Sequence, residues 1–238
     1  MLETLSDMKV ATFSELADAL PYPESTVYDY LQTMKRSGYV VDEGDKLRLS
    51  TRFLEFGMRS QQAIPVFEVL KPRANELAEK TDETVSFFIR EHDHCIAIYV
   101  SGGDSAVNFG LYAGLQLPLL KSAPGKAMLS QYTTDRVNRI LDEASFELPS
   151  DERGPLFDEL AQIETQGYAR DQEDLIEGLR GVAVPVVCRG EVLGALAAGG
   201  PAVRFRESQP PEQNLPELVS EAAKKIEIEA AYASPRYR

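Results

Sequence analysis

Apolar residues recur at helical spacing in a short segment near the N-terminus. Thr12 and Glu15, three residues apart, form the capping-box pattern that begins a helix. The apolar positions of this segment fall on one helical face: Phe13, Leu16, Ala17 and Leu20. Pro21 and Pro23 end the helix, because a proline lacks the amide donor and restricts the residue before it.

A second helix is predicted from about Glu24 to Arg36. Its buried stripe consists of Val27, of Tyr30 or Leu31, and of Met34. Gly38 then supplies a C-terminal stop of the left-handed kind. Two short helices separated by about four turn residues have the spacing of a helix-turn-helix.

The pattern next changes to that of a β-hairpin. Residues 39–41 and 46–49 read as strands, and the polar turn Asp42-Glu43-Gly44-Asp45 joins them. A hairpin directly after the second helix is a wing, so we expect a winged helix-turn-helix domain over residues 1–52. Its outer face would present these residues to DNA: Ser25, Thr26, Tyr28, Asp29, Gln32, Arg36 and Lys46. A small helical subdomain with a solvated polar face is the alternative.

Residues 50 to about 80 read as largely helical. Pro65 and Pro72 each permit a helix to start nearby but disturb one that runs through them. We therefore expect a helical linker over residues 53–63 and a second domain over residues 64–238.

From Thr84 onward strands and helices are mixed. Strands are expected at residues 85–90, 95–100, 107–111, 181–187 and 192–198, and helices at 126–140, 156–165 and 216–232. Gly167 stops the second of these helices. Helices arranged around antiparallel hairpins predict an α+β sensor domain with an antiparallel sheet, and not a parallel dinucleotide-binding fold.

Composition narrows the class of protein. The hydrophobic fraction of the 238 residues is 43% and the charged fraction 26%, as in an ordinary globular protein. No apolar run approaches the ~20 residues of a membrane span, and no basic flank precedes an apolar stretch. Cys95 and Cys188 lie far apart and read as free thiols in a reducing compartment. We expect a cytoplasmic protein without membrane contact.

The charge balance opposes DNA binding at first sight. Acidic residues number 38 and basic residues 25, which gives a formal net charge of -13. DNA binders usually carry a basic surface, because neutralising phosphates supplies much of their affinity. Either the protein does not bind DNA, or it works at high ionic strength with an acidic, well-solvated surface. The acidic residues are spread along the chain, which favours the second explanation.

Metal chemistry has one candidate in the sequence. His92, His94 and Cys95 lie in or beside one turn. Structural zinc needs about four ligands in closed geometry, and side chains along a hairpin point partly to opposite faces. A solvated turn is the favoured reading, so we predict neither a metal site nor a cofactor.

Nucleophilic catalysis has weaker candidates still. Cys188 is adjacent to Arg189 but has no nearby base, and Ser122 and Ser130 near Lys126 lack a third, orienting partner. We predict that the protein is not an enzyme.

Several segments together resemble the IclR family of transcriptional regulators. Residues 117–127, LPLLKSAPGKA, resemble the family's segment that leads into a Gly-Lys-Ala helix start. The family's later signature is matched by Gly167-Tyr168-Ala169, Glu173-Asp174, residues 178–186 (GLRGVAVPV), Gly190, Gly194-Ala195-Leu196 and Gly199-Gly200-Pro201. Residues 25–27 and 38–40 match its DNA-reading helix and wing entry. The order and spacing of these segments, over nearly the whole chain, carry the resemblance.

The resemblance implies a winged helix-turn-helix joined to a GAF-like effector-binding domain. It also implies a homodimer or homotetramer that binds double-stranded operator DNA and represses or activates transcription. The small-molecule effector, often an organic acid or aromatic compound, would lie in a pocket walled by the sheet. A metabolite-binding module without specific DNA binding is the main rival, and a metal-dependent enzyme using His92 and His94 is a weaker one.

The resemblance also points to effector-binding positions. Gly125 and Lys126 lie at a helix start whose amides could hold an anion, and Glu173 or Asp174 could meet a hydroxyl or a cation. Strand positions that line the family's cavity are Ala183, Pro185, Ala197 and Gly199. Relatives often carry Ser at the last two, so a more apolar or bulkier ligand is expected. Packing alone would also explain these small strand residues.

The chain departs from the family pattern at two places. Residues 1–5 resemble the end of a longer opening helix, so the start of the sequence is expected to fall inside that helix. Asp29 stands where many relatives carry Arg. A carboxylate can accept from a cytosine amino group but is repelled by phosphate, which leaves the usual base contact open.

Overall fold

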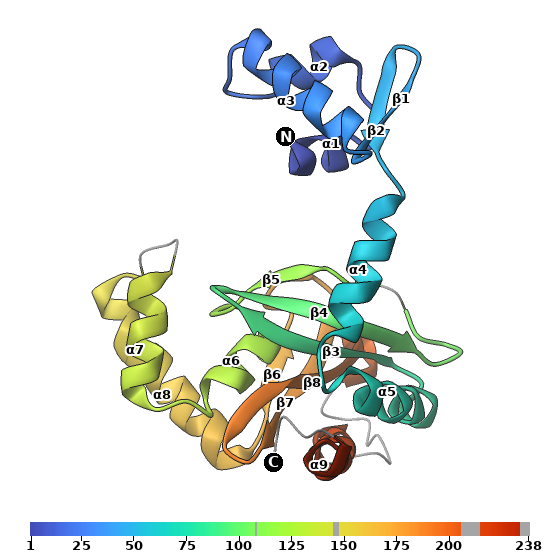
Figure 1. Ribbon diagram of the computed structural model, residues 1–238. Coiled ribbons are helices and arrows are strands. Elements are labelled where there is room, and N and C mark those ends of the chain that lie inside the picture. Colours follow the sequence, from blue (N-terminus) through green and yellow to red (C-terminus); the bar gives the residue numbers. More distant parts are fainter. Residues whose placement is uncertain (108, 145–147, 206–214, 234–238) are drawn as a thin grey trace. The chain divides into compact units, whose positions relative to one another are not determined.

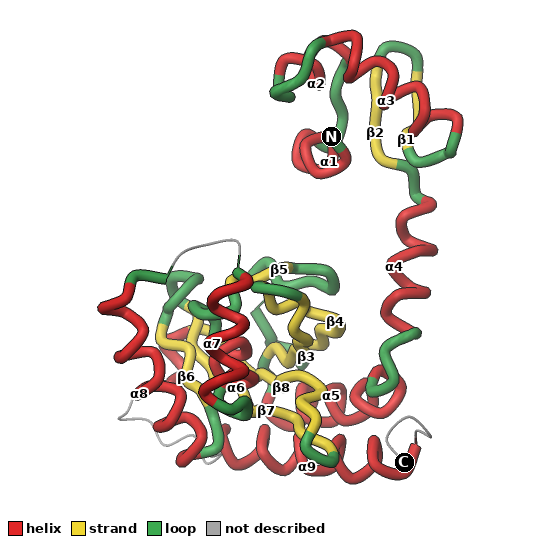
Figure 2. The backbone as a smooth tube through the Cα atoms, turned by 60° about the vertical axis from the view of Figure 1, so that its left-hand side comes forward, coloured by secondary structure: helices red, strands yellow, loops and turns green. Residues whose placement is uncertain are grey.

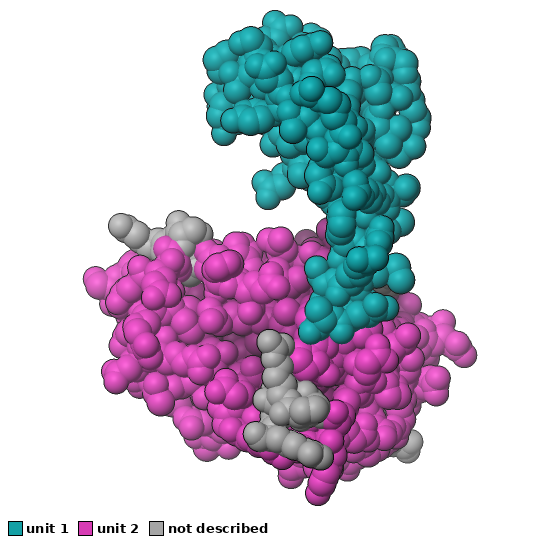
Figure 3. Space-filling view, viewed as in Figure 1, with its two compact units in different colours: residues 1–63 teal, residues 64–238 magenta. Residues whose placement is uncertain are grey.

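The computed structural model describes residues 1–107, 109–144, 148–205 and 215–233. The chain divides into two compact units, Met1–Ala63 and Ile64–Arg238, which are coloured separately in Figure 3. The first unit has one hydrophobic core and the second has two. Among the helices of the described ranges, none is both long enough and apolar enough to cross a membrane.

The first unit is a winged helix-turn-helix followed by one further helix (Figure 1). Its elements in chain order are α1 (Leu2–Met8), α2 (Phe13–Asp18), α3 (Glu24–Arg36), β1 (Val40–Glu43), β2 (Lys46–Leu49) and α4 (Arg52–Gln62). Buried side chains from the first five elements form the core: Leu5, Leu16, Leu31, Val40 and Leu47. This confirms the fold that the N-terminal pattern predicts.

The capping box fixes the start of α2. The Thr12 side chain accepts a hydrogen bond from the Glu15 amide at 3.3 Å, and the Glu15 carboxylate accepts one from the Thr12 amide at 2.7 Å. α3 has the predicted bounds, and Gly38 follows it with a φ of 73°. The start of α2 and the end of α3 therefore rest on local chemistry.

Two details of this unit differ from the prediction. Leu31 fills the buried stripe of α3, whereas Tyr30 is 57% exposed. The hairpin turn is also shorter than expected, because β1 extends through Glu43 and pairs it with Lys46. Gly44, with a φ of 79°, makes this tight turn possible.

The second unit is built on a six-stranded antiparallel sheet. Its strands are β3 (Thr84–Glu91), β4 (His94–Gly102), β5 (Gln116–Pro118), β6 (Ala169–Gln172), β7 (Leu179–Cys188) and β8 (Glu191–Pro201), and their spatial order is β5-β4-β3-β8-β7-β6. The central pair, β3 and β8, joins the two hairpins β3-β4 and β7-β8. The α+β class and the antiparallel sheet are confirmed.

Helices cover both faces of this sheet (Figures 1 and 2). On one face lie α5 (Phe67–Thr81) and α9 (Leu215–Ala233), packed on strand residues such as Val85, Phe87 and Leu196. On the other face lies α6 (Ala123–Leu129), packed on strand residues such as Phe88 and Ala195. α8 (Ser150–Gln166) packs against α6, and α7 (Thr134–Glu143) adds Val137, Ile140 and Leu141 to the same core. Alternate residues of β3, β7 and β8 therefore serve two separate cores.

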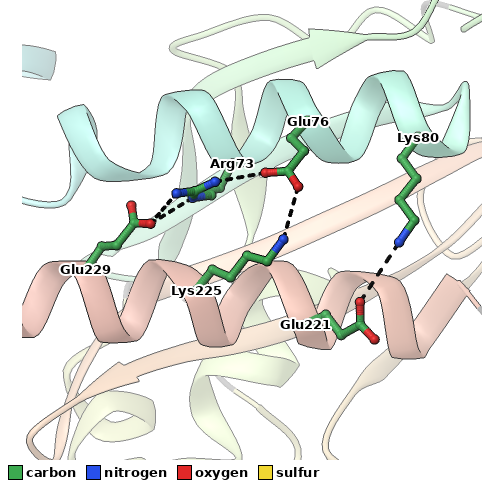
Figure 4. Close-up of polar contacts among 6 residues, drawn as sticks. All are labelled: Arg73, Glu76, Lys80, Glu221, Lys225 and Glu229. Carbon is green, nitrogen blue, oxygen red and sulfur yellow. Dashed lines mark hydrogen bonds and ion pairs between the residues drawn. The ribbon is translucent and has the colours of Figure 1, made fainter.

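Ion pairs join α5 to α9 along their exposed edge (Figure 4). Arg73 contacts Glu229 and Glu76, and Glu76 also pairs with Lys225 at 3.0 Å. Both helices pack on the sheet through apolar residues, and these charged pairs link their outer edges. Pro72 lies inside α5, so the helix runs through a residue that the sequence analysis expected to disturb it.

The sequence misplaced several elements on the α6 side of the sheet. Two helices, α6 and α7, replace the single helix expected over residues 126–140, because the Thr133 side chain accepts from the Arg136 amide and caps a new start. α8 begins at Ser150, well before the expected Leu156, with two acidic residues in its first turn.

The strand assignments also need correction. No strand forms in the described part of residues 107–111, and Asn108 lies outside the described residues. The partner of β4 at that edge is β5. The sequence did not predict β6, whose residues Arg170, Asp171 and Gln172 lack an apolar alternation.

Candidate functional site

α3 presents one polar stripe opposite its buried side. Val27 and Leu31 are buried, and the residues on the opposite side recur at helical spacing: Ser25, Tyr28, Asp29, Gln32 and Arg36. Tyr28 is half exposed and packs edge-on against Phe13 at 5.9 Å between ring centroids. Thr26 is half-buried at the border of this stripe. The residues predicted to read DNA thus share one accessible face, apart from Lys46 on the hairpin.

Few of the Lys and Arg side chains near this face are free of ion pairs within the described part of the protein. Lys35 pairs with Asp42, and Arg48 pairs with Glu43 at 2.6 Å. Arg36 and Lys46 form no ion pair with any residue in the described ranges. The positive charge available for phosphate contacts around α3 is therefore small, and Asp29 reduces it further.

A cavity opens on the α6 side of the sheet, and we call it the sheet pocket. Its floor is made by parts of two rows of cross-strand neighbours. The first row, which we call the glycine row, runs Asp171, Gly181, Gly199 and Thr84 across β6, β7, β8 and β3. The second, the alanine row, runs Ala169, Ala183, Ala197 and Ser86 across the same strands. Small residues at these positions leave room above the sheet, which larger side chains would fill.

The roof of the sheet pocket is apolar. Its residues come from the segment after β4, from β5 and the start of α6, and from the segment after β6: Leu111, Leu117, Ala123, Pro124, Leu175 and Ile176. The cavity encloses about 50 Å³. That volume holds a few water molecules and is smaller than the cavity of ~150 Å³ that accepts a benzene ring. The roof must therefore shift before a ring compound can enter.

Four polar side chains interrupt the apolar lining: Thr84, Ser86, Asp171 and Arg180. Asp171 Oδ1 accepts a hydrogen bond from the Asp174 amide at 3.2 Å, and Thr84 Oγ1 donates to the Val107 carbonyl at 3.2 Å. Ser86 is only 2% exposed and lies on the lining of the pocket. Burial raises the pKa of Asp171, and the nearby Asp174 carboxylate acts in the same direction. A carboxyl and a hydroxyl are thus held at a largely apolar cavity.

The residues predicted to bind effector fall into separate places. Ala197 and Gly199 line the sheet pocket. Ala183 is buried in the alanine row between Ala169 and Ala197, and Pro185 lies one row further along, opposite Ala195. All four positions lie on one face of the sheet, but only Ala197 and Gly199 line the pocket.

The start of α6 is closed to an anion. The Gly125 amide donates to the Ser122 hydroxyl at 3.2 Å, and the Lys126 amide donates to the Ser122 carbonyl at 3.0 Å. A Cβ atom on Gly125 would lie 1.9 Å from the Leu119 carbonyl oxygen. Gly125 therefore allows α6 to pack closely on the chain before it, and its amide is already satisfied.

Lys126, Glu173 and Asp174 also lie away from the sheet pocket's floor. Lys126 Nζ pairs with Glu159 at 2.8 Å and approaches Asp174 at 3.8 Å. Both Lys126 and Asp174 line a second cavity of about 880 Å³ between the β3-β4 turn and α8. The Glu173 carboxylate accepts from the Gly178 amide and pairs with Arg180. The structure therefore divides the predicted set between two cavities and a loop.

The alternative chemistries find little support in the geometry. Within the described ranges, no three His, Cys, Asp or Glu side chains converge to hold a metal ion. His94 pairs with Asp93 at 2.7 Å, and burial raises the pKa of Cys95 to about 12. Ser122 caps α6, and the Ser130 hydroxyl donates to the Ala127 carbonyl. His94, Ser122 and Ser130 thus each contact another residue or cap a helix.

Sequence reasoning missed Asp171, Thr84 and Ser86. Asp171 lies on the unpredicted strand β6, and the two hydroxyl residues lie at the start of β3, where apolar neighbours dominate. The alternation of small residues in β7 and β8 was the available signal, because small side chains on paired strands leave a hollow.

Comparisons with known proteins agree with this architecture. Residues 1–44 match the family model for the IclR helix-turn-helix domain, and residues 58–228 match that for the C-terminal domain of the bacterial transcriptional regulator IclR. The chain is 32% identical over 241 residues to the HTH-type transcriptional regulator KdgR of Escherichia coli K12, covering 98% of this chain and 90% of KdgR. It is 29% identical over 232 residues to the acetate operon repressor of Salmonella typhimurium, covering 94% of this chain and 83% of the repressor.

Solved structures show the same fold. The IclR protein of Thermotoga maritima matches with a TM-score of 0.73 and 20% identity, over 97% of this chain and 96% of its own. An IclR homolog from Microbacterium hydrocarbonoxydans, complexed with 4-hydroxybenzoate, matches with a TM-score of 0.77 and 22% identity, over 97% of this chain and 98% of its own. Regulators of this family bind DNA through the N-terminal helix-turn-helix and an effector through the C-terminal domain. Both family models and the KdgR relationship, spanning nearly the whole sequence, place the chain in the IclR family of bacterial transcriptional regulators.

Proposed function

We propose that this protein is a cytoplasmic, ligand-responsive regulator in which α3 reads operator DNA. The supporting observation is the single polar stripe of α3, accessible and followed directly by a hairpin wing. The proposed contacts are Ser25, Thr26, Tyr28, Asp29, Gln32, Arg36 and Lys46. In this proposal residues 1–52 bind DNA, residues 53–63 of α4 link the domains, and residues 64–238 bind the effector.

The proposed effector is a small organic or aromatic acid bound in the sheet pocket. The small floor residues Ala197 and Gly199 and the apolar roof support this site. The fold neighbour complexed with 4-hydroxybenzoate provides a precedent for an aromatic ligand in this type of domain. Ala183 and Pro185 would shape the floor, Gly125 the α6 wall, and Glu173 the loop that carries Leu175 and Ile176. Lys126 and Asp174 would act from the second cavity.

The proposed assembly is a homodimer through α4, with a homotetramer as the higher form. No residue of α4 is buried, although the helix carries several large apolar side chains. Leu54 and Met58, one turn apart, are 68% and 59% exposed. A second copy of the same helix would remove both from water, at about 25 cal/mol per Å² of apolar surface. Light scattering of a Leu54→Glu variant tests this, because a monomer is expected where the parent chain is a dimer.

A gel shift with the DNA upstream of the protein's own gene tests the DNA-binding half. Specific complexes are expected, and Gln32→Ala is expected to weaken them at least tenfold. Arg36→Ala is expected to weaken them as well, and Lys71→Ala is its control, because it removes the same charge from an exposed position in the other unit. No specific complex at either low or high salt would contradict the proposal and favour a metabolite-binding module without DNA binding.

A further inference from the structure

The unit that carries α3 has little positive charge with which to hold DNA. Residues 1–63 contain ten acidic side chains and only seven basic ones. A protein that neutralises roughly six to ten phosphates with Lys and Arg releases the counterions of those phosphates, and this release supplies much of its affinity. A unit with the opposite charge balance needs another source of affinity at the duplex.

Most of the seven cations are already held by other groups of the same unit. Three form ion pairs with carboxylates: Lys35, Arg48 and Arg59. A fourth, Arg52, donates to the Ser37 carbonyl at 2.7 Å. Of the remaining three, only Arg36 and Lys46 lie on α3 and the wing. Within the described ranges, each chain therefore presents two cations without an ion pair at the proposed DNA face.

Tyrosine side chains surround the polar stripe of α3, where cations are scarce. Tyr28 and Tyr30 are two positions apart, so they lie on opposite edges of the stripe, about 200° apart around the helix. Tyr22 lies in the turn before α3, between Pro21 and Pro23, which restrict the backbone there. The side chains of Tyr22, Tyr28 and Tyr30 are 56%, 51% and 57% exposed. Three accessible phenol groups thus frame the first half of α3.

Packing within the unit does not account for Tyr22 and Tyr30. Tyr28 packs edge-on against Phe13. Among the described residues, in contrast, Tyr22 and Tyr30 have no ring contact and their hydroxyls have no hydrogen-bond partner. Exposed aromatic side chains of this kind are typical of interfaces, where the ring is covered and the hydroxyl bonds the partner.

A phenol hydroxyl suits a phosphate oxygen without adding charge. Tyrosine is among the side chains that donate to the DNA backbone. Because the hydroxyl is neutral, its contact leaves the phosphate charge in place and releases no condensed counterions. The strength of such a contact changes little with salt, whereas salt screens the repulsion between the unit's carboxylates and DNA. A surface of this kind therefore keeps its affinity at high ionic strength.

We propose that Tyr22 and Tyr30 donate to operator phosphates in place of the Lys and Arg contacts of an ordinary helix-turn-helix. The operator complex is consequently held largely by neutral contacts and depends weakly on salt. This inference rests on the proposed DNA-binding function and adds which residues hold the DNA backbone. It also reconciles DNA binding with an acidic unit, because high ionic strength costs such a complex little.

The salt dependence of operator affinity is the first test. Fluorescence anisotropy with a labelled duplex from the DNA upstream of the gene would be recorded from low to high potassium chloride concentration. Two chains that each bring two cations to the duplex predict a slope of log K against log salt of about -4 or shallower, since each neutralised phosphate contributes roughly -0.9. A specific complex with a steeper slope would overturn the inference and leave the DNA-binding function standing. No specific complex at any salt concentration would remove the DNA-binding function itself.

Removing only the hydroxyls tests the two residues. Tyr22→Phe and Tyr30→Phe are each expected to weaken the complex about fivefold per bound chain at every salt concentration, as for the loss of one hydrogen bond. The slope and the melting temperature of the protein are expected to stay unchanged. Tyr112→Phe, which removes a hydroxyl from an exposed tyrosine of the other unit, is the control and is expected to retain full affinity. Full affinity in Tyr22→Phe or Tyr30→Phe would refute the contact assigned to that residue.

A charge introduced at position 30 tests whether that side chain reaches the DNA backbone. Tyr30→Lys is expected to tighten the complex at low salt and to steepen the slope by about 0.9 per bound chain, because one more phosphate is neutralised. Tyr112→Lys adds the same charge to the other unit and is expected to leave the slope unchanged. Equal slopes in these two variants would show that position 30 lies away from the phosphates, against the proposal.

Discussion

Glu173 and Arg180 form an ion pair across the base of the loop that roofs the sheet pocket, with Glu173 Oε1 3.0 Å from both Nε and Nη2 of Arg180. The other carboxylate oxygen accepts from the Gly178 amide at 3.1 Å. Glu173 itself has a φ of 70°, a left-handed conformation that a non-glycine residue adopts only when its surroundings hold it. One side chain therefore closes the loop that carries Leu175 and Ile176.

Glu173→Gln is expected to loosen this loop without unfolding the domain. The pair is about one-third exposed, so its loss is expected to cost roughly 0.5 kcal/mol. Amide exchange of residues 175–178 is then expected to rise about twofold to threefold, as measured by hydrogen-deuterium exchange. Glu177→Gln, in the same loop, provides the charge-matched control. Equal exchange rates in the two variants would show that the ion pair does not hold the loop.

Asp171 is expected to lower stability at neutral pH. Burial raises its pKa in the folded protein, so the folded state holds the proton more tightly than the unfolded chain does. The stability that this proton contributes is complete below the ordinary pKa and is lost as the pH rises through the raised one. The side chain of the Asp171→Asn variant does not titrate. The melting temperature of the variant minus that of the parent protein is therefore expected to increase as the pH rises from about 3.5 to 7.

Asp82 provides a control for that pH series, because its pKa is shifted in the opposite direction. Hydrogen bonding to the Ser105 amide lowers the pKa of Asp82, so its contribution is present at neutral pH and is lost as the pH falls through the lowered value. Asp82 has a φ of 56°, which Asn tolerates. Asp82→Asn is therefore expected to be less stable than the parent at neutral pH, with the difference closing in acid. The same trend with pH in both variants would contradict the assignment.

Gly125→Ala and Gly154→Ala are expected to act in opposite directions. The new methyl group at position 125 would lie 1.9 Å from a backbone oxygen, whereas nothing lies within 4 Å of the one at position 154 in α8. We expect a loss of about 3 kcal/mol or more for the first and a gain of roughly 0.5–1 kcal/mol for the second, since Ala is the better helix former. Urea unfolding followed by circular dichroism measures both, and two changes of the same sign would refute the packing argument for Gly125.

Asp29→Asn is expected to strengthen DNA binding at low salt. A carboxylate on the outer face of α3 lies among phosphates in the proposed complex, and its removal relieves about 1 kcal/mol of repulsion, or roughly fivefold in affinity. The gain is expected to shrink as salt increases, because ions screen the repulsion. Fluorescence anisotropy with labelled operator DNA measures it, with Glu3→Gln on α1 as the control. A loss of affinity at all salt concentrations would show instead that Asp29 makes a favourable base contact.

Local chemistry determined the first unit almost completely from the sequence. The Thr12–Glu15 capping box begins α2 and Gly38 follows α3, whose bounds are those predicted, whereas α2 ends at Asp18, before Leu20 and the two prolines. The same holds for the two long hairpins of the sheet, whose turns and alternation are read directly along the chain. The choice of Leu31 over Tyr30 for the core already depended on packing, because both residues suit that side of the helix.

The site was less accessible to sequence reasoning. Ala197 and Gly199 were found because small residues alternate on paired strands, and Gly125 was singled out as a ligand contact although it serves close packing. Glu173 and Lys126 carry charges that suggest ligand contacts, yet Arg180 and Glu159 engage them. No sequence pattern states which partner a charged side chain will find.

Tertiary structure alone decided the sheet pocket. Asp171 lies on a four-residue strand with no apolar alternation, and only its pairing with β7 brings it to the glycine row. Thr84 and Ser86 precede it by more than eighty positions and reach the same floor because β3 pairs with β8. Backbone pairing between distant segments fixes such neighbours, and its register depends on the whole sheet. The sequence therefore determined the elements and their class, and the order of the strands determined which side chains share a cavity.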